Sequence, residues 1–368
     1  MYSNKERFNR LFAGEPVDRA PFVNLLGIWG SCLVRWKNEG LSNDASMDDV
    51  YKIAGFDSDG RRGHYLHVNG LIWPEYDEKI IKQVDNKIWF TNKMGGISIN
   101  YTDQPFIPLV FEGALKDRKK WEEIKERLVW DTPGRFPGHW DEACKNAENS
   151  GEPIYTADLY YGFFGLPREL LGLEDLACLF YEDPELLHDI MDTLCELWVN
   201  LYTAFLKKAK LDYYIIWEDM CDKNGPLISP SFFREFMLPR YKRLTEALRG
   251  GGCKNIMVDS DGDVRELLPL WIEGGVNIMF PFETQFGLDI TEIRKKYPSL
   301  GMVGGINKLA LEGDRRDIDN ELKKVPFMLE SGRYIPGLDH GITHDVSWDN
   351  FRYFFDRLRE LIWKYKPN

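Results

Sequence analysis

The residues best suited to chemistry in this chain are Asp339 and His340, which precede Gly341 at the end of an apolar run. Histidine has the ordinary pKa nearest neutrality, and glycine lets the backbone turn sharply or lie close to a ligand. An imidazole and a carboxylate at the mouth of a buried strand can act as acid and base or as metal ligands. Alternatively, both residues only cap the following turn, and this segment alone does not separate the two interpretations.

Further carboxylates follow other apolar runs in the second half of the chain. They are Glu218, Asp219, Asp259, Asp261, Asp263 and Glu283. Buried carboxylates are costly unless they hold a cation, share a proton or face a base. We therefore expect Glu218, Asp261 and His340 to be catalytic. The candidate ligands of a metal such as zinc are Glu218, Asp259, Asp261 and His340. General acid/base catalysis and capping of loops are the alternatives, and capping is preferred for Asp263.

Aromatic and polar residues near other predicted strand ends are candidates for substrate contacts. Tyr160 and Tyr161 could flank a planar or apolar ligand, with core packing as an equal alternative. His64 could contribute to a substrate lid or contact an anion, although an ordinary surface-loop position is the simpler interpretation. Trp29 and Asp339 complete the predicted substrate-binding residues.

Short β-rich runs alternate with longer amphipathic segments from about residue 153 onward, which is typical of βα units around a parallel sheet. These runs cover residues 153–157, 213–217, 255–258, 276–280, 300–305 and 333–337. Residues 21–26 predict one more strand at the front. Seven or eight strands with this spacing favour an α/β fold of the (β/α)8 TIM-barrel type. Such barrels carry their active sites at the carboxyl ends of the strands. The acidic residues would then converge at one end.

The first 150 residues are less regular. Residues 80–92 alternate around Asp85-Asn86, and this pattern together with residues 95–101 predicts a small antiparallel hairpin. We place it at about 75–115, as an insertion in a single domain that covers residues 1–368. Residues 116–127 predict a mixed-charge helix that faces solvent. Pro184 and Pro230 each stand in the first turn of a predicted helix, where the missing N–H costs little.

Composition limits the classes of function. The 368 residues, 43% of them hydrophobic, can bury a large core. A formal net charge of −12 argues against a nucleic-acid partner. The six cysteines form no CxxC pair, which indicates reduced thiols. Because the chain shows neither an apolar signal region nor a run of roughly eighteen apolar residues, we expect a cytoplasmic protein without a membrane partner.

Several motifs, taken in order, resemble the uroporphyrinogen decarboxylase superfamily nearly from end to end. They lie at residues 5–21, 225–230, 304–307 and 339–350, with Phe236 and Pro239 beyond the second. The resemblance implies a (β/α)8 barrel with its cleft at the carboxyl ends of the strands. Related barrels often form homodimers across their cleft faces, so a homodimer is a candidate assembly.

Two further motifs distinguish the decarboxylases of the superfamily from its methyltransferases. The decarboxylases carry an Arg-Gln-Ala-Gly-Arg segment whose arginines hold the substrate carboxylates, whereas residues 27–36 here lack that pair. His340 does match the decarboxylases' histidine. The methyltransferases of the superfamily hold zinc with a His-x-Cys pair and a later cysteine. Here Asp259-Ser260-Asp261 stands in place of His-x-Cys, and residues 338–340 lie near the position of the later cysteine.

The preferred interpretation is a corrinoid-linked methyltransferase or demethylase acting on a small molecule, with the corrinoid supplied by a partner protein and zinc as the candidate metal. The first alternative is a decarboxylase of uroporphyrinogen or another carboxylate. The second is non-catalytic binding of a tetrapyrrole or corrinoid.

Overall fold

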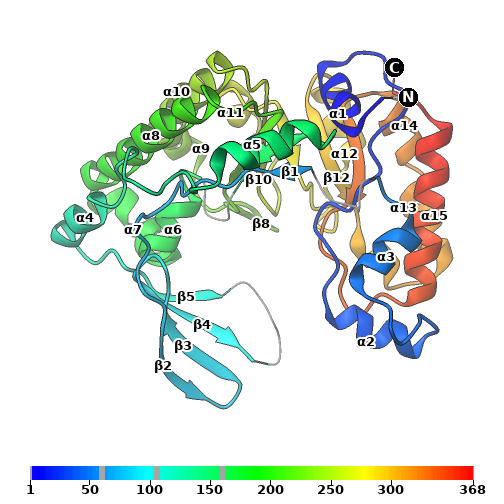
Figure 1. Cartoon of the computed structure of the whole chain (residues 1–368), viewed down its shortest axis with the longest axis horizontal. Helices are drawn as coiled ribbons and strands as arrows, with labels where there is room; N and C mark the ends of the chain where they lie inside the picture. The colour runs from blue at the N-terminus through cyan, green and yellow to red at the C-terminus, as the bar shows by residue number, and fades with distance from the viewer. Residues whose placement is uncertain (1, 58–62, 103–107, 158–161, 368) are drawn as a thin grey trace.

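The centre of the protein is a curled sheet of seven parallel strands, ordered β1-β6-β7-β10-β11-β12-β13 (Figure 1). The computed structural model describes residues 2–57, 63–102, 108–157 and 162–367. The strands are β1 (His64–Tyr65), β6 (Ile154–Thr156), β7 (Tyr213–Trp217), β10 (Asn255–Asp259), β11 (Ile278–Phe280), β12 (Gly301–Ile306) and β13 (Tyr334–Leu338). The last six confirm the six strands predicted from residue 153 onward.

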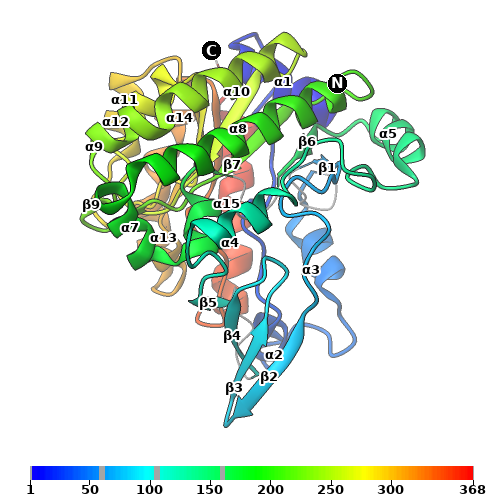
Figure 2. The ribbon, with the colours of Figure 1, turned by 90° about the vertical axis from the view of Figure 1, so that its left-hand side faces the viewer.

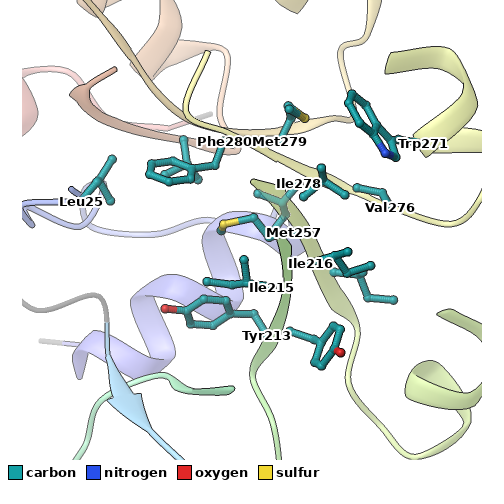
Figure 3. Close-up of a cluster of buried hydrophobic side chains, with 14 of the residues drawn as sticks. Leu25, Tyr213, Ile215, Ile216, Met257, Trp271, Val276, Ile278, Met279 and Phe280 are labelled. Carbon is teal, nitrogen blue, oxygen red and sulfur yellow. The ribbon is translucent and has the colours of Figure 1, made fainter. Parts of the chain in front are cut away.

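The last five strands of this sheet, β7 to β13, are buried on both faces, as expected of a parallel sheet covered by helices. Ile215 of β7 pairs with Met257 of β10, which in turn pairs with Ile278 of β11. Figure 3 shows these side chains together with Phe280 and Tyr213 in one apolar cluster. Continuous β-branched and aromatic runs, and not alternation, therefore mark these strands in the sequence.

Helices connect and cover the strands. They are α1 (Asn4–Ala13), α2 (Ser31–Asn38), α3 (Met47–Ala54), α4 (Arg118–Lys125), α5 (Trp140–Asn149), α6 (Gly165–Leu171), α7 (Leu173–Glu182), α8 (Pro184–Leu206), α9 (Pro230–Phe232), the π-helical turn η2 (Phe233–Met237), α10 (Leu238–Gly250), α11 (Leu268–Glu273), α12 (Ile290–Lys296), the 3-10 turn η3 (Lys308–Leu311), α13 (Arg315–Leu322), α14 (Val325–Glu330) and α15 (Trp348–Lys364). The two predicted proline-led helices are confirmed as α8 and α9. The side chains of Asp183 and Ser229 cap them. The predicted mixed-charge helix is α4, which buries Trp121 and Ile124 on one face.

The strand predicted over residues 21–26 does not form. Pro21 has no N–H to donate, and the N–H of Phe22 donates to the carboxylate of Asp57 at 2.9 Å. This segment therefore cannot supply a regular ladder. A single isolated bridge, between Ile28 and Ile342, ties it to the chain after β13. The described part of the parallel sheet has seven strands and is curled, without an eighth strand to close the ring.

The predicted hairpin is part of a larger antiparallel sheet of order β2-β3-β4-β5. Its strands are β2 (Lys79–Val84), β3 (Lys87–Thr91), β4 (Ile97–Tyr101) and β5 (Leu109–Glu112). The turn at Asp85-Asn86 is confirmed, and Asp85 adopts the positive φ of 53° that such a tight turn favours. Beyond β5, the N–H of Leu115 donates to the carbonyl of Leu170, which joins this sheet to α6.

The two ends of the parallel sheet are differently covered. Helix α1 lies at the amino ends of the strands, where Lys5 pairs with Asp212 at 3.1 Å just before β7. The four-stranded sheet projects from the opposite side of the molecule, away from both chain termini (Figures 1 and 2). The carboxyl ends of the strands thus face the side that carries the small sheet. Among the described residues, no helix has the length and apolar character to cross a membrane.

Candidate active site

Five side chains from four strand ends come together at the carboxyl end of the parallel sheet. Donor atoms of Asp261, Glu283 and His340 lie within 4.8 Å of one another. Those of Asp219, Asp259 and Asp261 form a second such set, so Asp261 belongs to both. We call these five residues the acidic–imidazole group. The structure thus brings together three predicted site residues, Asp259, Asp261 and His340.

Two of these strand ends bend into a conformation that non-glycine residues rarely adopt. Asp219, two residues after β7, has φ 44°, and Phe282, two residues after β11, has φ 58°. Positive φ at such residues costs free energy, and it clusters at functional sites where the fold over-determines the backbone. Both bends stand at or beside a member of the acidic–imidazole group, since Phe282 precedes Glu283.

Glu283 and His340 form the best-defined contact in the group. His340 Nδ1 lies 3.2 Å from Glu283 Oε1 and 3.0 Å from the carbonyl oxygen of Asp339. Both neighbours are acceptors, so Nδ1 carries the proton and Nε2 is the nitrogen left for a ligand. Glu283 also accepts hydrogen bonds from the N–H of Gly262 at 2.7 Å and from Gln285 Nε2 at 3.0 Å. This carboxylate is therefore held in place from three sides.

Crowding and burial shift the pKa values within the group. Burial raises the pKa of Asp261 to about 8, and the nearby carboxylate of Asp219 adds to the rise. The hydrogen bond to Glu283 raises the pKa of His340 to about 9, against the opposing effect of burial. Burial opposes the ionisation of Glu283, yet hydrogen bonds from His340 and Gly262 prevail and lower its pKa. Without a bound metal, these raised pKa values favour a protonated Asp261 and a protonated His340 at neutral pH.

Glu218, predicted to be catalytic and a metal ligand, is not brought into this group. Its carboxylate accepts hydrogen bonds from the backbone N–H groups of Phe163, Phe164 and Gly165, and from the hydroxyl of Tyr241 at 2.5 Å. Four donors occupy its two oxygens, and the side chain is fully buried. Burial raises the pKa of Glu218 to about 6. Glu218 fastens the amino-terminal turn of α6 to the end of β7.

Asp339, predicted to bind substrate, is likewise engaged within the protein. Its Oδ2 accepts from the N–H and hydroxyl of Thr284, and its Oδ1 accepts from the N–H of Lys308. These bonds join the loops after β11 and β12 to the end of β13. The structure thus gives Asp339 the capping role that the sequence left open, next to His340.

The other predicted substrate contacts are placed differently. Trp29 lies at the turn that carries His340, because a Cβ on Gly341 would stand 3.0 Å from Trp29 Nε1. His64 lies in β1, where its backbone N–H donates to Pro153, and it belongs to neither set of donors. Tyr160 and Tyr161 fall outside the described residues.

The donor set fits a divalent metal with hard or borderline character. Carboxylate oxygens and an imidazole nitrogen are accepted by zinc, and three protein ligands leave a position open for substrate, as catalytic zinc requires. No cysteine joins either donor set among the described residues, although thiolates would be the softest ligands available. All six cysteines are free, and burial raises the pKa of Cys221 and Cys253 to about 12.

Two members of the acidic–imidazole group were not predicted as site residues from the sequence. Asp219 and Glu283 were both recognised as carboxylates that follow a strand, but they were left out of the predicted site. The rule that each polar residue beyond a strand end is a candidate would have included both. What the sequence could not supply is the backbone bend that turns each side chain toward Asp261 or His340.

The model of the uroporphyrinogen decarboxylase (URO-D) family matches residues 162–361. The uroporphyrinogen decarboxylase of Gloeobacter violaceus is 23% identical over 182 residues, which cover 49% of this chain and 50% of that protein. That of Hahella chejuensis is 24% identical over 229 residues, with 60% and 59% covered. The chain thus spans about half to three-fifths of the length of these relatives.

Among solved structures, a methyltransferase from Methanosarcina mazei has a similar fold. It superposes with a TM-score of 0.61 at 16% sequence identity, and the match covers 98% of this chain and 100% of that one. At this level of identity the likeness concerns the fold.

Proposed function

The chain belongs to the uroporphyrinogen decarboxylase family, and from this premise we propose that it is a metal-dependent methyltransferase. In this proposal it removes a methyl group from a small molecule and passes it to a corrinoid carried by a partner protein. The observation that carries the proposal is the convergence of Asp261, Glu283 and His340, whose donor atoms lie within 4.8 Å of one another.

The charge of the site supports this choice over a polycarboxylate substrate. Four carboxyl groups and one imidazole form the acidic–imidazole group, and the buried carboxyl of Asp339 is close enough to Glu283 for the two charges to repel. A substrate that brings several carboxylates would meet like charges there. A cationic or neutral methylated compound would not meet this repulsion.

The missing arginine clamp points the same way. In the stretch where the decarboxylases carry two arginines, the one arginine here is Arg35 of α2. Its guanidinium already binds Glu39 Oε1 and the carbonyl of His344, both at 2.7 Å. Arg35 is therefore committed to holding α2 against the loop after β13.

We assign the holding of the metal to Asp261 and His340, with Asp219 and Asp259 beside them. Glu283, whose two oxygens already accept from His340, Gln285 and Gly262, would orient the imidazole. A divalent metal held there would act as a Lewis acid on the heteroatom that bears the methyl group. The hydrogen bond from His340 Nδ1 to the Asp339 carbonyl fixes the ring and leaves Nε2 as the ring nitrogen available to a metal. Gly262 and Gln285 fix the Glu283 carboxylate in the same way.

Decarboxylation is the second candidate, and one observation favours it. With pKa values of about 8 and about 9, Asp261 and His340 can each hold a proton at neutral pH. Such a store could protonate the carbon that loses carbon dioxide. The two candidates exclude each other at these residues, since a bound metal displaces the protons.

The test uses the purified natural chain. Metal analysis after expression with zinc should find about one metal ion per chain. When it is supplied with cob(I)alamin and a panel of methyl ethers and methylated amines, the protein should form methylcob(III)alamin. The absorbance of methylcob(III)alamin measures this reaction. Absence of stoichiometric metal would contradict the proposal. So would conversion of uroporphyrinogen to coproporphyrinogen at an enzyme-like rate, which would establish the second candidate instead.

A further inference from the structure

A cavity of about 510 Å³ lies between the four-stranded sheet and α6. Figure 1 shows the small sheet below α6, and the bond from Leu115 to Leu170 joins the two. Its volume falls within the range of roughly 300–1,000 Å³ of small-molecule sites. No member of the acidic–imidazole group is among the described residues that line it. The described lining of this cavity therefore differs from the acidic–imidazole group, although the Asp219 carboxylate of that group helps to raise the pKa of Glu169.

The walls of the cavity are aromatic and apolar. Tyr65 and Phe90 contribute rings, and Leu71, Ile72 and Met94 contribute aliphatic surface. The Tyr65 ring is steadied by Tyr155, with centroids 5.4 Å apart. Faces of aromatic rings attract cations, and they pack equally well against an apolar body.

The charges that line the cavity are mainly negative. In the described part of the lining, Glu75, Glu78 and Glu169 stand against one lysine, Lys93. Lys93 already pairs with Glu75 at 3.1 Å. Two carboxylates, those of Glu78 and Glu169, are thus left without a cation from the lining. An anionic ligand would be repelled here.

Glu169 is the more buried of these two carboxylates. Its side chain is 12% exposed, and it accepts no hydrogen bond from any residue that the structure describes. Among the residues that the structure describes, the cation paired with it is Arg168, with Nε 3.7 Å away. Arg168 is engaged elsewhere, because it donates to the carbonyl of Asp219 at 2.7 Å and stacks over Trp217. Burial accordingly raises the pKa of Glu169 to about 7.

We propose that this cavity binds an organic ammonium compound, with its cationic head at Glu169 and its apolar body against Tyr65 and Phe90. A cation bound at Glu169 could approach the carboxylate more closely than Arg168 does, since Arg168 Nε is 3.7 Å away. The aromatic walls would add cation–π attraction and exclude water. The proposal does not depend on methyl transfer, and its test requires no turnover.

The test compares three ligands of one shape by titration calorimetry on the natural chain. Choline is the cation, 3,3-dimethylbutan-1-ol is its neutral counterpart, and 3,3-dimethylbutanoate is the anion. Choline should bind saturably and at least about fivefold more tightly than the alcohol, and the anion should not bind. The proposal is overturned if choline fails to saturate the protein, or if the alcohol or the anion binds as well as choline.

Two variants test the assignment of the head and the walls. Glu169→Gln should weaken choline binding about tenfold and leave the alcohol unchanged. Glu174→Gln, an exposed residue of α7 outside the cavity, is the matched control and should change neither. Phe90→Leu, on β3 of the small sheet, should weaken the binding of choline more than that of the alcohol. If a folded Glu169→Gln variant bound choline as tightly as the natural chain does, Glu169 would not be the residue that binds the cationic head.

Discussion

The imidazole of His340 and the carboxylate of Glu283 meet across the carboxyl ends of two strands, with Nδ1 3.2 Å from Oε1. His340 follows β13 and Glu283 follows β11, and β12 lies between them in the sheet. The contact therefore spans a whole strand, and it depends on the curl that draws the strand ends together. It also sets the ionisation of both partners, since it raises the pKa of His340 and lowers that of Glu283.

Because these two residues act as one unit, their substitutions should not add. Glu283→Gln and His340→Gln should each reduce methyl transfer to cob(I)alamin by about a hundredfold. The double variant should lose little more than either single one. The measurement is the initial rate of methylcob(III)alamin formation for all four proteins. Losses that multiply in the double variant would show that the two side chains act independently.

The loop after β10 offers a matched pair for the metal assignment. Asp261→Asn removes a residue shared by both donor sets and should reduce bound zinc, measured by plasma mass spectrometry, at least about tenfold. Asp263→Asn alters a carboxylate on the same loop that pairs with Arg265 instead. It should keep the natural metal content. Equal metal content in the two variants would remove Asp261 from the ligand set.

Glu218 should matter for stability more than for chemistry. In Glu218→Gln, one oxygen is replaced by an amide N–H that faces backbone N–H donors, so hydrogen bonds at Phe163–Gly165 are lost. We expect a fall of about 2–4 kcal/mol in the free energy of unfolding, measured by urea denaturation. Glu266→Gln, at an exposed position, should stay within about 0.5 kcal/mol. A neutral Glu218→Gln would contradict the structural role.

Glu169 should give the stability a pH dependence of defined sign. Burial raises the pKa of Glu169 in the folded protein from 4.5 to about 7. As the pH rises, Glu169 therefore loses its proton in the unfolded chain before it does so in the folded protein. The free energy of unfolding of the natural protein falls as the pH rises from about 4.5 through 7. Glu169→Gln has no group that ionises at this position. The free energy of unfolding of the variant minus that of the natural chain should therefore increase by up to about 3 kcal/mol between pH 5 and pH 8. Urea denaturation at both values measures the change, and a constant difference would show that Glu169 ionises freely.

Gly162 should tolerate no side chain. A Cβ there would stand 2.2 Å from the carbonyl oxygen of Trp217 and 2.3 Å from Glu218 Oε2, both closer than real Cβ contacts. Gly162→Ala should therefore cost at least about 2 kcal/mol in thermal or urea unfolding. Gly138→Ala is the control, because a Cβ there meets nothing within 4 Å. Equal stabilities of the two variants would show that the loop before α6 can shift.

The sequence by itself determined the parallel strands after residue 153, the hairpin turn at Asp85-Asn86 and the proline-led helices. These features are local, since apolar runs, tight-turn residues and first-turn prolines act through neighbours in the chain. It also indicated which end of the sheet carries the candidate site, because every candidate carboxylate follows a strand. It could not foresee that residues 21–26 would not pair, because the competing acceptor for Phe22 is Asp57, 35 residues away.

Only the tertiary structure separated Glu218 from Asp219. The two are adjacent carboxylates after one strand, and nothing in the sequence distinguishes their roles. The fold fills the oxygens of Glu218 with donors from the loop before α6 and from Tyr241 of α10. It gives Asp219 a positive φ, and Asp219 joins Asp259 and Asp261 in the site. The role of a carboxylate depends on which donors reach its oxygens, and those donors come from segments far apart in the chain.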